Sequence, residues 1–133
     1  MEWHKVVVRY ADGRLMKGYT RNILPNRERF HLHPEPGAPG KGREVYMRDL
    51  KAVFFVRDFA GNRQYDEKKV HLAEETFQGH IVEVTFADGE IIVGSTPAYD
   101  PRRQGFFLVP LDPESNNLRV FIVSRAVRDV RHI

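Results

Sequence analysis

The chain contains one sequence pattern twice, and this internal repeat limits what it can fold into. Residues 4–34 align without a gap on residues 80–110, with roughly thirteen identical positions. Both copies contain Val-x-Val-x-aromatic-Ala-Asp-Gly, then Gly-x-Thr, and then Pro-x-Arg-x-x-Phe-x-Leu-x-Pro. Self-similarity of this kind is typical of two copies of one structural unit.

The repeat extends to whole small domains if the second copy has one extra loop residue. The apolar positions that then match are Val45, Leu50, Val53 and Val56 with Ile122, Val127, Val130 and Ile133. We therefore expect one unit at residues 1–57, a linker at 58–78, and a second unit at 79–133. A domain of this size buries only about 60% of its unfolded surface. The two units should therefore pack on each other, and we expect Phe59, Tyr65 and Phe77 to anchor the linker.

Each copy begins with the pattern of a β-hairpin. Alternation of Val6, Val8 and Tyr10 with polar residues indicates a half-buried strand. Ala-Asp-Gly then supplies the turn, because Asp and Gly suit the conformations of tight hairpins. The return strand contains Gly18 or Gly94, and an internal glycine predicts a bend or bulge there.

Three further short strands follow in each copy. The predicted ranges are 30–33 and 106–109, then 44–48 and 119–124, and finally 50–56 and 127–133. Five short strands with a bent second strand are typical of a small SH3-like barrel. The predicted fold class is therefore all-β, with two tandem five-stranded SH3-like or Sm-like barrels.

The composition is that of an ordinary globular protein, with 41% hydrophobic and 29% charged residues and a formal net charge of +3. No apolar run approaches the ~20 residues needed to span a bilayer, so no membrane span is predicted. Lys5 and Arg9 interrupt the only candidate for a signal-peptide core, so no signal peptide is predicted, and we expect the chain in the cytoplasm. The absence of cysteine excludes disulfides and thiolate zinc sites. We expect no cofactor and no metal.

One part of the pattern resembles the Sm and Lsm proteins. In copy one it consists of Asp12, Gly13, Gly18, Met47, Arg48, Leu50 and Val53, and in copy two of Asp88, Gly89, Gly94, Arg125, Val127 and Val130. The resemblance implies the small-barrel fold. Sm-like proteins bind RNA through an aspartate and an asparagine between the second and third strands. This chain instead has Asn26-Arg27-Glu28 and Arg102-Arg103-Gln104 in that loop.

A second stretch, residues 116–123 with Ala126-Val127, is similar to uncharacterised bacterial domains associated with PilZ or receiver modules. This similarity implies a bacterial signalling or regulatory context. One of the two PilZ elements that hold cyclic di-GMP is missing, so binding of that nucleotide is not implied.

Arginine is concentrated in the loop before the third strand of both copies. The candidate binding residues are Arg21, Arg27, Arg29, Tyr99, Arg102 and Arg103. Arginine beside an aromatic ring can hold a phosphate and stack a base. The alternative is a solvated loop whose charge discourages aggregation of the sheet edge.

The outer strand face differs between the copies and predicts an interface. Copy two has Ile81, Ile91 and Val93 where copy one has two lysines and a leucine, and copy one contributes Val7 and Tyr19 to the same face. A strand that is apolar on both faces is normally covered on both. We therefore expect burial of these side chains by the other unit, the linker or a second subunit.

No catalytic motif is present, and Asp12 and Asp88 are explained as turn residues. We therefore expect no enzyme. The leading hypothesis is a non-enzymatic binding or adaptor module with a protein partner, and the alternative is RNA or DNA binding through the paired arginine loops. The sequence leaves open a monomer of two pseudo-symmetric units or a homodimer.

Overall fold

The computed structural model describes residues 2–21, 23, 25–60, 79–97, 99–112 and 114–133. Two of the predicted linker anchors, Tyr65 and Phe77, lie outside these residues. The first copy contains β1 (His4–Tyr10), β2 (Leu15–Thr20), β3 (Arg29–Leu32), β4 (Arg43–Tyr46), the 3₁₀ turn η1 (Met47–Asp49) and β5 (Leu50–Val56). The second contains β6 (His80–Phe86), β7 (Ile91–Thr96), β8 (Gly105–Pro110), β9 (Asn117–Val123), η2 (Ser124–Ala126) and β10 (Val127–His132).

The two copies have the same strand order. An eight-stranded antiparallel sheet runs β10-β6-β7-β8-β9-β5-β1-β2, and β3 and β4 form a separate pair. A bridge between Tyr19 and His33 connects β2 to the end of β3. Each copy therefore has the order fifth, first, second, third and fourth strand. The prediction of an all-β chain is confirmed, and the internal repeat is visible in the topology.

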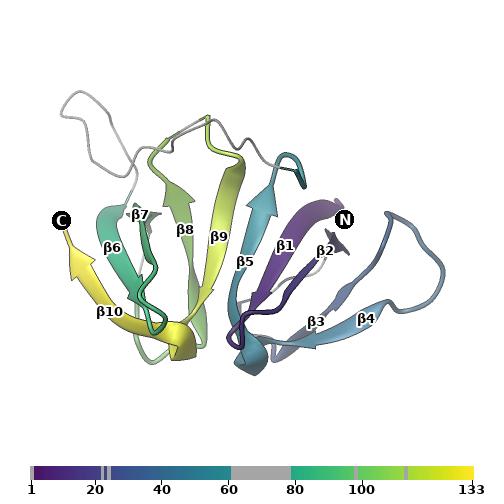
Figure 1. The fold of residues 1–133 in the computed structure, drawn as a ribbon, viewed down its shortest axis with the longest axis horizontal. Coiled ribbons are helices and arrows are strands. Elements are labelled where there is room, and N and C mark those ends of the chain that lie inside the picture. The colour runs from purple at the N-terminus through teal and green to yellow at the C-terminus, as the bar shows by residue number, and fades with distance from the viewer. Residues whose placement is uncertain (1, 22, 24, 61–78, 98, 113) are drawn as a thin grey trace.

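The described strands do not show two separate closed barrels. The large sheet crosses from one copy to the other where β5 pairs with β9, so both copies share it (Figure 1). Neither of the two described sheets closes on itself. The reason is that β5, which already pairs with β1, takes its second partner from the other copy instead of from β4.

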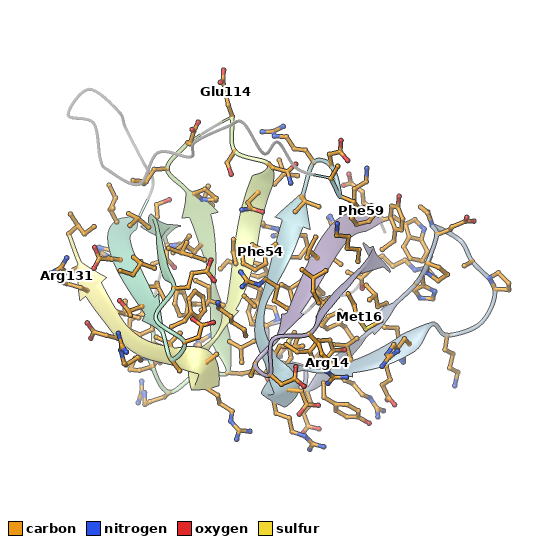
Figure 2. The ribbon with its side chains drawn as sticks, in the orientation of Figure 1. Arg14, Met16, Phe54, Phe59, Glu114 and Arg131 are labelled. Carbon is orange, nitrogen blue, oxygen red and sulfur yellow. The ribbon has the colours of Figure 1, made fainter. Side chains whose placement is uncertain are left out.

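The central strands β5 and β9 are buried on both faces, and their side chains alternate between two cores. One core, called here the first core, is built mainly from copy one, and the second core mainly from copy two. On β5, Val53 and Phe55 enter the first core. Phe54, which is labelled in Figure 2, enters the second core. On β9, Phe121 enters the first core and Ile122 the second. Each copy therefore completes the core of the other, which explains why both strands have near-continuous apolar sequences.

The repeated glycine of the second strand permits a close approach of the third strand. The register between β1 and β2 is unbroken past Gly18, and that between β6 and β7 is unbroken past Gly94. Of the bend or bulge expected at these glycines, the bulge is therefore absent. A Cβ atom on Gly18 would lie 2.8 Å from the carbonyl oxygen of His33, and one on Gly94 would lie 2.5 Å from that of Val109. A side chain at either position would push the next strand away.

The Ala-Asp-Gly turns form as expected. Gly13 and Gly89 have φ of 97° and 94°, in the left-handed region that favours glycine. The carboxylate of Asp12 accepts a hydrogen bond from the Arg14 backbone N–H at 3.0 Å, and that of Asp88 accepts one from Glu90 at 2.9 Å. These contacts support the interpretation of both aspartates as turn residues.

An ionic cluster connects the turn of copy two to the strands of copy one. The Lys51 side chain, 4% exposed as a residue, donates from Nζ to Asp88 Oδ2 at 2.6 Å and also to Glu90. Arg9 pairs with Glu90 at 2.9 Å. The hydrogen bond from Lys51 is the main cause that lowers the pKa of Asp88. Among the described residues, the equivalent Asp12 side chain bonds only to its neighbour Arg14, so in this part of the chain the cluster occurs on one side of the pseudo-symmetric pair.

The shared cores predict that a mutation in copy two will destabilise copy one. Phe121 is fully buried in the first core. Phe121→Ala should lower the free energy of unfolding by about 3–5 kcal/mol. Native-state hydrogen exchange should show faster exchange in β1 and β2 as well as in β8. Protection of β1 and β2 at the wild-type level would contradict the shared core.

The ionic cluster predicts coupling between Lys51 and Asp88. In a double-mutant cycle of Lys51→Met with Asp88→Asn, we expect a coupling free energy on the order of 1 kcal/mol. The matched cycle with Asp12→Asn should be additive. Because the pKa of Asp88 is lowered in the folded protein from its ordinary 3.8, its stabilising contribution is present above that pH and is lost as the pH falls below it. Equal coupling in both cycles, measured by denaturant unfolding at pH 7, would refute the specific pair.

Candidate anion-binding site at the junction of the copies

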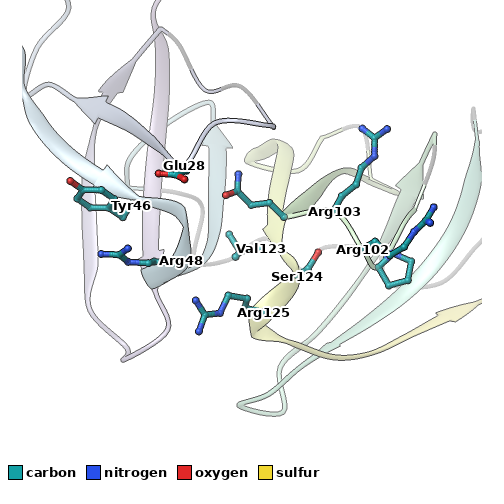
Figure 3. A pocket seen from close by; sticks show the side chains of 10 residues that line it. Glu28, Tyr46, Arg48, Arg102, Arg103, Val123, Ser124 and Arg125 are labelled. Carbon is teal, nitrogen blue, oxygen red and sulfur yellow. The ribbon is translucent and has the colours of Figure 1, made fainter.

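A cavity of about 560 Å³, called here the junction cavity, lies at one end of the β5–β9 pair, with walls from both copies (Figure 3). Copy one contributes Glu28, Tyr46 and Arg48, and copy two contributes Pro101, Arg102, Arg103, Gln104, Val123, Ser124 and Arg125. Its volume is within the range of pockets that bind small molecules.

The pairing of β5 with β9 creates this site. The two strands are antiparallel, so the start of β5 lies beside the end of β9. η1 immediately precedes β5 and η2 immediately follows β9, and the two turns lie at the same end of the sheet (Figure 1). Arg48 of η1 and Arg125 of η2, which occupy equivalent positions in the two copies, therefore line one cavity.

The two loops that the sequence singled out meet at this cavity. The side-chain amide of Gln104 donates to the backbone oxygens of Pro25 at 3.1 Å and Arg27 at 2.7 Å. The backbone N–H of Ser124 donates to the backbone oxygen of Gln104 at 2.9 Å, and that of Met47 donates to the backbone oxygen of Glu28 at 2.8 Å. The loops are thus tied to each other and to the turns.

The cavity has an excess of positive charge, with four arginines and one glutamate. Arg102 is paired with Asp100 through two contacts of 3.1 Å, and this pairing lowers the pKa of Asp100. Within the described part of the chain, the side chains of Arg48, Arg103 and Arg125 have no hydrogen bond or ion pair. The Arg48 guanidinium lies 5.0 Å from the centroid of the Tyr46 ring. Such unpaired guanidinium groups can bind carboxylate or phosphate through two parallel hydrogen bonds.

A buried hydroxyl borders the same site. Ser124 Oγ is shielded from solvent and has no hydrogen-bond partner among the described residues. The hydroxyl can donate to an oxygen of a bound group. Arg48, Ser124 and Arg125 were not predicted as site residues. The signal that could have identified the two arginines was their recurrence at matched positions of both copies.

The predicted arginine set is only partly brought together. Arg102 and Arg103 line the cavity, and the loop of Arg27 adjoins it through its backbone. Arg29 instead pairs with Glu44 at 2.7 Å, and a hydrogen bond to Tyr46 raises its pKa. The remaining two candidates make aromatic contacts elsewhere: Arg21 lies 4.8 Å from the Trp3 ring, and Tyr99 lies 4.9 Å from the Phe106 ring.

The apolar candidates of copy one, Val7 and Tyr19, are half-buried by contacts within the chain. Val7 pairs with Phe54 and packs against the second core. Tyr19 contacts Phe59 edge to face, with ring centroids 5.4 Å apart. Phe59 therefore anchors the start of the linker on this face, as predicted.

The apolar candidates of copy two differ from one another. Val93 is 5% exposed and lines a cavity of about 90 Å³ with Phe54 and Val120, so copy one helps to cover it. Ile81 is half-buried. Ile91 is 42% exposed, so the described part of copy one does not cover it. Most of the linker and a second subunit, which the prediction also allowed as cover, lie outside the described residues, so the burial of Ile91 stays a prediction.

Comparison with known proteins gives a family without a known activity. No curated protein and no solved structure matches the chain. Among the described residues, no helix has the length and apolar character needed to cross a membrane. A family model matches residues 2–133, nearly the whole sequence. The chain therefore belongs to the family of unknown function DUF6982.

Proposed function

We propose that the chain is a non-enzymatic binding or adaptor module that holds an acidic segment of a partner protein in the junction cavity. One observation carries this proposal: Arg48 and Arg125, from equivalent positions of the two copies, line one cavity, and neither forms an ion pair with a described residue, although Glu28 also lines the cavity. A carboxylate between them would be bound from both sides. The bacterial cytoplasmic regulatory context inferred from the sequence suits such a module.

The lining residues support binding more than catalysis. The described walls contain arginine, glutamine, serine and one glutamate, with no histidine or cysteine. General acid–base catalysis normally uses a group with a pKa near neutrality. Arginine stays charged over the physiological pH range, so this site is suited to holding an anion rather than to moving a proton.

A protein partner is favoured by the mixture of charge and apolar surface. Tyr46, Pro101 and Val123 line the cavity beside the arginines. Arginine and tyrosine are enriched among the residues that contribute most to the affinity of protein interfaces. An acidic side chain with its aliphatic stem would contact both kinds of surface.

Nucleic acid remains the alternative because of the exposed arginines. The side chain of Arg102 is 89% exposed. In Figure 3, Arg102 and Arg103 extend away from the wall that copy one forms. A phosphate backbone could contact them outside the cavity while Arg48, stacked on Tyr46, supported a base.

We also propose that each copy is an SH3-like small barrel that is open between its fourth and fifth strands, on the side that faces the other copy. It is supported by the repeated strand order and by the presence of a separate core for each copy. The β5–β9 pair lies where the two open barrels meet. The candidate binding site forms at one end of this strand pair.

The proposal predicts that acidic peptide binding depends on the two equivalent arginines. The double variant Arg48→Gln, Arg125→Gln should weaken binding of a fluorescein-labelled hexaglutamate peptide by about tenfold or more, since each charge-assisted hydrogen bond contributes about 1.5–3 kcal/mol. The matched control is Arg14→Gln, Arg131→Gln, which removes the same charge at arginines paired with Asp12 and Glu83. Fluorescence anisotropy at 50 mM salt measures both.

Two outcomes of this experiment would contradict a protein partner. Equal weakening in both double variants would mean that net charge, not the cavity, drives binding. Binding of a labelled dT12 strand without binding of the peptide would support the alternative, and phosphate contacts at Arg102 and Arg103 would then give a log–log salt slope of about −1.4, from about −0.7 per contact.

A further inference from the structure

A second cavity, of about 460 Å³, lies at the opposite end of the β5–β9 pair. Its walls include Trp3 and Lys5 from the start of copy one, Val56 from the end of β5, and Leu118 and Arg119 from the start of β9. It shares no lining residue with the junction cavity. The two ends of one strand pair thus carry two separate cavities.

Arg119 is held in this cavity by aromatic rings. Its guanidinium carbon lies 4.3 Å from the ring centroid of Phe55 and 4.6 Å from that of Phe107. Among the described residues, no group forms a hydrogen bond or ion pair with the Arg119 side chain. Burial also lowers its pKa. A guanidinium that is partly removed from water and lacks a counter-ion would be stabilised by an anion.

The backbone next to Arg119 is irregular in a way that shapes the cavity. Arg119 is opposite Phe55, but the next pair is Asn117 with Val56, so Leu118 has no partner residue on β5. A bulge of this kind redirects side chains and is common beside functional sites. Leu118 is 47% exposed. An apolar side chain therefore stands in the open beside the arginine.

The charges around the cavity favour an incoming anion. Lys5 provides a second cation, and its Nζ makes a long contact of 3.4 Å to the Arg57 backbone oxygen. Arg57 also lines the cavity and donates from Nε to the Ser115 oxygen at 3.0 Å. Glu2 is the acidic residue of the lining; it is exposed and has no ion pair with a described residue.

We propose that the cavity around Arg119 is a second binding site, which takes a carboxylate of a partner protein together with a neighbouring apolar side chain. The planar guanidinium fork matches the two oxygens of a carboxylate. Leu118, Val56 and Trp3 supply the apolar contact. This mixed surface differs from nucleic-acid sites, which are more polar and much more positively charged. The proposal rests on the proposed function only because both assume a protein partner, and it uses different residues.

The chain provides a local probe for this site, because Trp3 is its single tryptophan and lines the cavity. Tryptophan fluorescence would be titrated with three peptides: acetyl-Gly-Ser-Leu with a free carboxyl end, its amide, and acetyl-Gly-Glu-Leu amide. We expect a saturable change with at least one carboxylate peptide and none with acetyl-Gly-Ser-Leu amide. A response to the first alone assigns the site to chain ends, and a response to the third alone assigns it to acidic side chains.

Three variants assign the signal to Arg119. Arg119→Gln should weaken binding by about tenfold or more, because it removes a charge-assisted hydrogen-bond donor. Arg119→Lys should retain part of the affinity, since it keeps the charge but loses the fork. Arg131→Gln, at the far end of the sheet (Figure 2), should change nothing. Melting curves of each variant identify loss of folding, and if Arg119→Gln is unfolded the lysine variant carries the test.

Several results would overturn the proposal. These are the absence of a saturable change with any carboxylate peptide, an unchanged titration in the folded Arg119 variants, and a response to inorganic phosphate or dT12 equal to that of the peptides. The double variant Arg48→Gln, Arg125→Gln should leave the Trp3 titration unchanged. An unchanged titration would support binding at the Arg119 cavity even if the junction cavity failed to bind the acidic peptide.

Discussion

The antiparallel pairing of β5 with β9 is the interaction on which the rest of this structure depends. Strands buried on both faces need an apolar partner on each side, and here the two copies provide it for one another. Phe54 belongs to copy one but packs in the second core, and Phe121 belongs to copy two but packs in the first core. A unit of about 55 residues is marginal by itself. The exchange of core side chains makes one folding unit from two marginal ones.

The same pairing explains where the cavities lie. Each end of the central pair joins loops of both copies, so a lined hollow forms at each end. The strands equivalent to β9 and β5 are β4, in the separate pair, and β10, at one edge of the large sheet, and both carry charge. β4 has Arg43 and Glu44 where β9 has Val120 and Phe121, and β10 has Arg131 where β5 has Phe54. Charged edge strands discourage further strand pairing.

The sequence predicted the local structure well because local structure has short-range signals. Alternation around Val6 and Val82 identified the strands, and the Ala-Asp-Gly turns formed with glycine in the left-handed region. The partner of β5 was not predicted, because pairing between segments distant along the chain leaves no local pattern. The strand from Leu50 to Val56 is buried along its whole length, and its apolar run from Ala52 to Val56 is typical of a strand covered on both faces. Such a run does not show which strand covers it.

The candidate site was predicted only in part, because it too depends on a pairing between segments that are distant along the chain. Arg102 and Arg103 were identified because their loop recurs in both copies, and they do line the junction cavity. Arg48 and Arg125 were interpreted only as part of the Sm-like fold pattern. They line one cavity because β5 pairs with β9, and that pairing was not predicted. Gly18 was correctly marked as special, but its role is the close approach of His33 rather than a bulge.

The shared core is tested most directly by differential scanning calorimetry of the intact chain. If β5 and β9 make the two copies one cooperative unit, the chain should unfold in a single transition whose calorimetric and van't Hoff enthalpies are equal. Two resolved transitions, or a van't Hoff enthalpy about twice the calorimetric one or about half of it, would contradict a single monomeric cooperative unit. A ratio near one is the result that this account predicts.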